Sequence, residues 1–489
     1  MSSGLSAAEI RGKFDHPVID ADGHIVEIAP VYEEYIAKAA GPEVRDRAVD
    51  SMKGPLRLWY DLSEEERLQR HLTRPPFWVH PASNSYDLAT AVLPNLMRAR
   101  MDEIGVDLSI VYPTFGLQVP RIPDDEIRRA MCRALNLMHH ELFSDHADRL
   151  IPAATIPMQT PDEALDEIRY ACDELGYKVV MLQGIVRRPF LGQDGKPVPG
   201  NPVWIDPLGI DSLYDYDPLW QALVDRGIPA NMHAGAMSVG MRASPSNYVY
   251  NHIGHFASAH EACCKALLLG GVTRRFPDLA FGFLEGGVGW ATTLHGDLIA
   301  HWEKRNGNAI QDLNPKTIDF ARFRELCDEY AAPDHRAALE PFTENCHWFF
   351  AADLEQAPEA EDEWAKSGIR TDEDFARIFS RNFYFGCEAD DRAVAGAFNT
   401  KANPFGARLN ALFSSDIGHW DVPDIAGVLA EAYELVDDEL IDEADFRDFV
   451  FTNTVRLQTL NRPDFFEGTA VEDAVNEFLA AESRAQAAE

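Results

Sequence analysis

Basic residues are scarce in this chain of 489 amino acids. Lysine and arginine number 44 against 80 aspartates and glutamates, so the formal net charge is −36 with neutral histidines. A surface this acidic repels the phosphates of nucleic acids and anionic membranes. We therefore expect a small-molecule substrate and neither a nucleic-acid nor a membrane partner.

Long apolar runs, a signal-peptide pattern and CxxC motifs are also missing. No apolar run approaches the ~20 residues that cross a bilayer, and the N-terminus lacks the basic, apolar and small-residue order of a signal peptide. The seven cysteines form no CxxC pair, and an odd number in a long chain is typical of reduced thiols. These absences predict a cytoplasmic protein without a disulfide framework.

Eight short runs rich in β-branched and aromatic residues recur between segments with helix signals. Nearly continuous apolar runs are typical of parallel strands that are buried on both faces. Helices are expected between them, for example over 161–176, 217–227 and 256–276. The eight predicted strands cover residues 17–24, 106–113, 150–157, 177–184, 228–234, 279–285, 382–388 and 411–416.

Strands that alternate with helices form either a closed (β/α)8 barrel or an open doubly wound sheet. No GxGxxG follows the first run, so the usual dinucleotide signature is missing. Polar residues instead follow widely separated runs, and only a barrel brings all eight carboxyl ends to one rim. We predict an α/β chain with a TIM-barrel fold and long insertions after strand 1 and between strands 6 and 7.

The chain is long enough for about three average domains or for one large barrel with insertions. We predict a barrel over 17–460, with insertions at 31–95 and 302–381. Residues 1–16 are expected to form an N-terminal arm and residues 461–489 a C-terminal tail. Insertions of this length often cover a functional site.

Acidic residues and histidines end three of the predicted strands. In the first strand, alternation places Asp20, Asp22 and His24 on one face, while His233 ends the fifth run and Asp416 the eighth. Each residue alone also fits a polar strand end, a hydrogen-bonded core histidine or a helix N-cap. Together, Asp22, His24, His233 and Asp416 predict one divalent metal ion, with zinc preferred and manganese or iron as alternatives.

Other polar residues at the same rim are candidates for catalysis and substrate binding. Glu285 and Glu388, which end the sixth and seventh runs, are candidate acid–base residues together with Asp416; alternatively, the two glutamates form a buried pair that orders loops. Arg187 is a candidate for binding a substrate carboxylate, or else one of an exposed pair of loop arginines. The candidate substrate-binding residues are His252, His255, His419 and Arg187.

Several stretches resemble one protein family. VIDADGHIVE, PLWQALVDRGIPANMHAG, RRFPDLAFGFLEGGVGW, NFYFGCEADD and SSDIGHWD occur in the family's order between about residues 17 and 460. On these stretches the chain resembles the amidohydrolase superfamily, and specifically the amidohydrolase-related branch. That branch also holds decarboxylases of the aminocarboxymuconate-semialdehyde and hydroxybenzoate types.

The resemblance implies a single catalytic metal held by Asp22, His24, His233 and Asp416. The chain departs from the family at two positions, since many members have histidine at the positions of Asp22 and Glu285. The fourth predicted strand has a lysine only at its opposite end, so no carbamylated-lysine site with two metals is expected. Family habit and the insertions also imply a homodimer or a larger homo-oligomer.

Two reactions and one non-catalytic role are compatible with these residues. The preferred prediction is a hydrolase in which a metal-activated water attacks a carbonyl, C–N or C–C centre of a small, cyclic or aromatic, carboxylated substrate, with Asp416 as acid and base. The alternative is a non-oxidative decarboxylase of an aromatic acid, a C–C lyase with the same metal ligands. The third possibility is a non-catalytic binding barrel.

Overall fold

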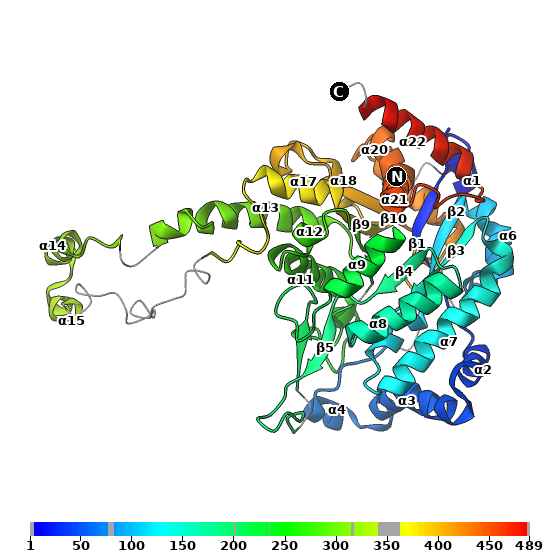
Figure 1. Ribbon diagram of the computed structural model, residues 1–489, viewed down its shortest axis with the longest axis horizontal. Coiled ribbons are helices and arrows are strands. Elements are labelled where there is room, and N and C mark those ends of the chain that lie inside the picture. Colours follow the sequence, from blue (N-terminus) through cyan, green and yellow to red (C-terminus); the bar gives the residue numbers. More distant parts are fainter. Residues whose placement is uncertain are drawn as a thin grey trace.

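Eight parallel strands form one closed sheet, which confirms the predicted (β/α)8 barrel (Figure 1). The computed structural model describes residues 4–76, 83–199, 202–233, 235–313, 317–340 and 362–486. Each strand overlaps the run that predicted it, and its two ends lie within two residues of the ends of that run. The strands are β1 (Ile19–Ile25), β2 (Leu108–Pro113), β3 (Leu150–Thr155), β4 (Val179–Leu182), β7 (Ala230–Met232), β8 (Phe281–Phe283), β9 (Phe383–Glu388) and β10 (Asn410–Ser414).

The barrel closes where its first strand meets the segment that follows its last strand. The backbone N–H of Asp416 donates to the carbonyl oxygen of Asp22 at 3.1 Å, and the N–H of His24 donates to that of Ile417 at 3.1 Å. Three of these four residues were predicted as metal ligands, and the fourth, Ile417, follows one of them in the sequence. Closing the barrel therefore also brings the residues of the predicted metal site together.

Asp20 ties three strands together and does not share a face with Asp22 and His24. The pairing of β1 with β2 shifts register between Asp20 and Gly23, and this irregularity breaks the alternation that was expected from the sequence. Asp20 accepts hydrogen bonds from Ser109 Oγ at 2.6 Å, Ser415 Oγ at 2.7 Å and Ser415 N at 2.9 Å. A Cβ atom at Gly23 would lie 2.5 Å from Asp20 Oδ2, so glycine is required beside this carboxylate.

We expect Asp20→Ala to lower the free energy of unfolding by about 3 kcal/mol, because it leaves buried donors of Ser109 and Ser415 without an acceptor. Asp20→Asn keeps one acceptor oxygen and the shape of the side chain, so we expect a loss of about 1 kcal/mol. Urea unfolding followed by tryptophan fluorescence measures both values. Equal losses in the two variants would show that these hydrogen bonds do not stabilise the barrel.

Helices surround the barrel, and their ends follow local sequence signals. In α9 (Asp217–Arg226), proline occupies the first turn and Gly227 ends the helix with φ of 64°, as the sequence predicted. The helix expected over 256–276 is two helices, because Gly271 adopts φ of 76° between them. The other helices of this layer are α6 (Pro94–Ile104), α7 (Asp125–Phe143), α8 (Pro161–Ile168), α11 (His255–Leu269), α12 (Val272–Arg275), α13 (Gly289–Arg305), α18 (Val394–Phe398), α19 (Val428–Asp437), α20 (Glu443–Arg447) and α21 (Asn453–Thr459).

The two long insertions are mainly helical where the structure describes them. α13 continues to Arg305, so the second excursion begins after the predicted residue 302. In Figure 1, α14 and α15 project away from the barrel. A third excursion, the antiparallel hairpin of β5 (Val186–Pro189) and β6 (Val203–Asp206), was not predicted. The insertion helices are α2 (Ala29–Ala40), α3 (Pro42–Asp61), α4 (Glu64–Arg70) and α5 (Ser85–Val92), then α14 (Phe320–Tyr330), α15 (Arg336–Leu339) and α17 (Glu373–Arg381).

Both ends of the described chain pack against the barrel. α1 (Ala7–Arg11) buries Ala7 and Ile10, and Phe465 is fully buried ahead of α22 (Glu472–Gln486). Within the described ranges, no helix has both the length and the apolar character needed to cross a membrane. The six described cysteines are all free, while Cys346 lies outside the described residues. The domain boundaries, the cytoplasmic location and the homo-oligomeric state stay predictions.

Candidate metal centre

Three of the predicted ligands form a compact group inside the mouth of the barrel. Asp22 and His24 come from β1, and His233 follows β7. His24 Nε2 lies 3.3 Å from His233 Nε2 and 3.5 Å from Asp22 Oδ1, and His233 Nε2 lies 3.4 Å from the same oxygen. All three residues are at most 2% exposed, so their polar atoms are withdrawn from bulk water.

Asp416 and Glu285 add carboxylates to this group. Asp416 follows β10, with Oδ1 3.5 Å from His24 Nε2, and Glu285 follows β8, with Oε2 3.5 Å from His233 Nε2. Both adopt left-handed backbone conformations, with φ of 49° at Asp416 and 57° at Glu285. Such values are uncommon for residues other than glycine and concentrate at functional sites. The two strained positions are therefore the ones that direct carboxylates towards the histidines.

Asp22, His24 and His233 have the donor spacing that one metal ion requires. Ligand atoms about 2.1 Å from an ion lie about 3.4 Å apart in a tetrahedral arrangement, and these three donors lie 3.3–3.5 Å apart. His24 also belongs to a second group of donors, with Asp416, Glu285 and His419, whose ligand atoms all lie within 4.8 Å of one another. Asp22 Oδ1, Asp416 Oδ2 and Glu285 Oε2 are buried and have no hydrogen-bond partner among the described residues, which is rare in proteins. No lysine or arginine of the described chain forms an ion pair with these carboxylates. The residues fit a divalent cation.

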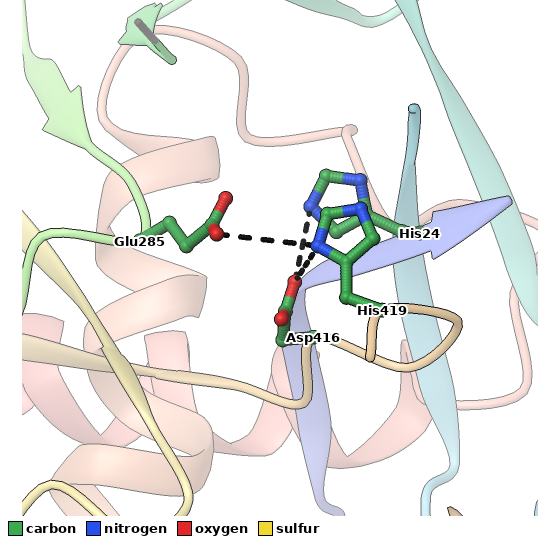
Figure 2. A group of neighbouring side chains, drawn as sticks. All are labelled: His24, Glu285, Asp416 and His419. Atoms are coloured by element: carbon green, nitrogen blue, oxygen red, sulfur yellow. Dashed lines mark ion pairs between the residues drawn. The ribbon is translucent and has the colours of Figure 1, made fainter. Parts of the chain in front are cut away.

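His419 lies beside this group and contacts Asp416 (Figure 2). Its Nδ1 is 2.6 Å from Asp416 Oδ1 and 4.0 Å from Glu285 Oε1, and its ring stacks on His24 with centroids 4.0 Å apart. The other ring nitrogen, Nε2, is 3.2 Å from Thr114 Oγ1. His419 therefore links the carboxylate of Asp416 to a polar side chain at the edge of the site.

The crowding of carboxylates shifts their titration. Burial raises the pKa of Asp416 and that of Glu285 well above the ordinary values, and neighbouring carboxylates raise them further. Burial and the nearby Asp421 raise the pKa of Glu388 to about 8. A divalent cation would relieve this repulsion. In the opposite direction, burial and then His233 lower the pKa of His419 to about 3.

The structure separates Glu388 from the residues that touch one another. Glu388 ends β9, but in the described chain it forms no ion pair with the predicted ligands, and it acts on Asp416 through charge alone. Asp421 was not predicted to belong to the site, yet its charge acts on Glu285, Glu388 and Asp416. The only sequence signal for Asp421 is its place at the end of SSDIGHWD.

The candidate substrate-binding residues His252 and His255 lie near the site on two different helices. His252 ends α10 (Tyr248–His252), and α11 starts at His255, because Gly254 between them adopts φ of 68°. Their rings are 4.8 Å apart, and His252 also lies 5.5 Å from the ring of Trp420. The pair still forms a continuous aromatic wall, which is compatible with the predicted contact to a substrate.

The candidate Arg187 and its neighbour Arg188 have different surroundings, and neither is fully exposed. Arg188 is buried and pairs with Asp206 at 2.9 Å, so it stabilises the β5–β6 hairpin. Arg187 is half-buried and donates to the carbonyl oxygen of Met237 at 2.8 Å. Arg121, which no motif marked in the sequence, lies close enough to Arg187 for their charges to interact.

Comparison with known proteins identifies one sequence family and several structures of similar fold. The sequence pattern of the amidohydrolase family matches residues 19–308. No curated protein sequence matches significantly. Among solved structures, the dihydroxybenzoic acid decarboxylase from Polaromonas sp. JS666, with bound manganese and the inhibitor 2-nitroresorcinol, is 17% identical with a TM-score of 0.47 over 91% of this chain and 98% of that chain.

Two further solved structures have similar values. The 5-carboxyvanillate decarboxylase from Novosphingobium aromaticivorans DSM 12444, complexed with manganese and 4-hydroxy-3-methoxy-5-nitrobenzoic acid, is 14% identical with a TM-score of 0.47 over 91% of this chain and 96% of that chain. An amidohydrolase from Mycobacterium avium subsp. paratuberculosis K-10 is 17% identical with a TM-score of 0.49 over 91% and 100%, respectively.

Proposed function

The chain belongs to the amidohydrolase family, and on this premise we propose that it is a metal-dependent, non-oxidative decarboxylase of a small hydroxylated aromatic acid. The observation that carries the proposal is the buried contact of 2.6 Å between Asp416 and His419, next to a group of donors that is rich in carboxylates. The sequence alone favoured hydrolysis and gave decarboxylation as the alternative, so this proposal reverses that preference. The same residues serve both reactions, so charge and burial have to decide between them.

The charges of the donors disfavour hydrolysis. Asp22, Asp416 and Glu285 together more than offset the two positive charges of a divalent cation, whereas zinc sites that activate water with three histidines add no negative charge. The bound cation would supply a positive charge that holds substrate oxygens and stabilises negative charge on them. Because the donor set is rich in oxygen, we propose manganese ahead of zinc.

Asp416 and His419 supply the proton that decarboxylation consumes. The bond between the ring carbon and the substrate carboxylate breaks, its electron pair remains on the ring carbon, and neutral CO2 leaves. Asp416 donates a proton to that carbon. His419, in contact with Asp416 on one side and Thr114 on the other, passes a replacement proton from the edge of the site.

Burial of the site favours the same reaction. Asp22, His24, His233 and Asp416 are at most 2% exposed. A carboxylate that has lost its hydration shell is destabilised relative to the neutral CO2 that it releases, so exclusion of water lowers the barrier. Hydrolysis, by contrast, needs a water molecule within the same enclosed space.

Hydrolysis remains the second candidate because of one atom. Asp416 Oδ2 has no hydrogen-bond partner and lies beside the histidines, where it can accept a proton from an attacking water. In this reaction Asp416 acts first as a base, whereas in decarboxylation it acts first as an acid.

Product analysis separates these reactions. Protein loaded with manganese or zinc is incubated with 2,6-dihydroxybenzoate and other hydroxybenzoates, and separately with amides and lactones, in D2O and in oxygen-18 water. We expect CO2 and an aromatic product with deuterium on the carbon that lost the carboxylate, and no oxygen-18 in that product. Oxygen-18 in a product without CO2 release would establish hydrolysis instead. Metal binding without turnover of any substrate would support a binding barrel.

A further inference from the structure

Two arginines at the rim of the barrel have no carboxylate partner in the described chain. Arg121 ends the short helix η2 (Val119–Arg121) that follows β2, and Arg187 lies on β5. Arg121 Nη2 donates to the carbonyl oxygen of Gly235 at 2.7 Å, and Arg187 Nη2 donates to that of Met237 at 2.8 Å. Both guanidinium groups are thus anchored on one short loop that follows the predicted ligand His233.

The fully buried arginines of the described chain differ from these two, because each of them pairs with an acid. Arg128 and Arg188, which are fully buried, each pair with a carboxylate, at 2.7 Å and 2.9 Å. Arg121 and Arg187 are half-buried, and in the described residues their guanidinium groups donate to backbone carbonyls and form no ion pair with a carboxylate. Burial lowers the pKa of Arg121 to about 10, so it keeps its charge at neutral pH. A partly buried cation without an anion costs free energy that a bound anion offsets.

The loop that anchors the arginines is joined to the metal centre by packed aromatic rings. A Cβ atom at Gly235 would lie 2.1 Å from His255 Nδ1, so His255 packs directly on this loop. The ring of His255 lies 4.0 Å from that of Phe256, which lies 5.4 Å from that of His233. The loop that anchors the guanidinium groups therefore lies at the same end of the barrel as the predicted ligands, and contacting aromatic side chains link the two.

We propose that Arg121 and Arg187 form a subsite for a second anionic group of the substrate, separate from the carboxylate that reacts at the metal centre. Planar guanidinium groups bind carboxylates through paired hydrogen bonds, and the neighbouring rings of His255 and Phe256 suit a flat apolar ring. The substrate class is thereby narrowed to small aromatic acids with two acidic groups. The identity of the reacting group rests on the proposed function, whereas the anion subsite does not.

Binding of unreactive acids tests the subsite. Isothermal calorimetry on metal-loaded protein compares benzoate with the three benzenedicarboxylates. We expect the best dicarboxylate to bind at least about tenfold more tightly than benzoate, as one additional charged hydrogen-bonded contact implies. Arg121→Gln and Arg187→Gln should each remove most of this preference and leave benzoate binding unchanged. Equal binding of benzoate and all three dicarboxylates to the unmodified protein would overturn the proposal.

Matched variants exclude general damage to the protein. Arg129→Gln removes an exposed arginine that pairs with Asp166 at 3.0 Å, and it should leave the preference for the dicarboxylate intact. Every variant should unfold cooperatively and bind the same amount of metal as the unmodified protein. A loss of benzoate and dicarboxylate affinity to the same extent in the Arg121 and Arg187 variants would contradict a separate subsite. If the protein releases CO2 but binds dicarboxylates no better than benzoate, the subsite is refuted and the proposed reaction is not. If it prefers dicarboxylates but releases no CO2, the proposed reaction is refuted and the subsite is not.

Discussion

Asp416→Asn is expected to lower kcat by about a thousandfold, within the range by which a positioned acid accelerates proton transfer. Asparagine keeps the shape of the side chain and one oxygen that can bind a metal, but its amide has no proton to deliver to carbon at neutral pH. The contact with His419 Nδ1, at 2.6 Å in the unmodified protein, can be kept by the same oxygen. Single-turnover CO2 release at saturating metal and substrate measures the loss.

Asp421→Asn is the matched control for this variant. Asp421 lies in the same motif and contributes charge to the site, but it forms no ion pair with the predicted ligands in the described chain. We expect kcat to change less than about tenfold, because only a long-range charge is removed. Metal content should be normal in both variants. An Asp416→Asn protein that retains a tenth of the original kcat would show that another group delivers the proton.

Removal of the metal with a chelator is expected to abolish activity and to lower the melting temperature, and this destabilisation should increase with pH. Without a cation, the folded protein holds the pKa of Glu388 at about 8 and that of Asp416 well above its ordinary value. Folded-state carboxyl pKa values above the unfolded values stabilise the fold at low pH, and that stability is lost as pH rises through the folded-state pKa. The metal-free protein should therefore be less stable at pH 9 than at pH 6.

Readdition of metal should restore both properties. Ligands must be deprotonated to bind the cation, so its affinity rises with pH, and metal at a thousandfold excess over its Kd stabilises the fold by about 4 kcal/mol. Scanning calorimetry between about pH 6 and about pH 9 compares the melting temperatures of the metal-free and the metal-loaded protein. Glu388→Gln should keep the stabilisation by metal and flatten the pH dependence, whereas His24→Ala should lose the stabilisation by metal. Identical melting temperatures with and without chelator at pH 8 would contradict a metal centre.

The barrel and the ligand group could be predicted because both depend on simple periodic features. Apolar runs mark parallel strands that are buried on both faces, and closing the sheet forces the ends of all strands to one rim. The separations of Asp22, His233 and Asp416 along the chain therefore do not matter, and the structure brings these residues within a few ångströms of His24 or of one another. The role of these residues as metal ligands stays a proposal.

The remaining features depend on geometry that a sequence pattern does not contain. The register shift after Asp20 reverses the expected alternation, and a single left-handed glycine splits the histidines of 252–255 between two helices. Arg121 lies in a three-residue helix that no sequence motif marks. It became a candidate for anion binding only because the fold leaves it without a carboxylate partner in the described chain. The proposal of decarboxylation in place of hydrolysis likewise depends on how many carboxylates lie close together, which only the folded chain shows.

The seam of the barrel also has a consequence for biosynthesis. Asp20 and Ser415, 395 residues apart in the chain, are hydrogen-bonded across this seam, and the proposed cation lies next to it. A ribosome-bound nascent chain cannot assemble the complete ligand set until its last strand has emerged and docked. Metal would then bind only after the whole barrel has been synthesised and folded, and the ion would link the first and the last strands to be made.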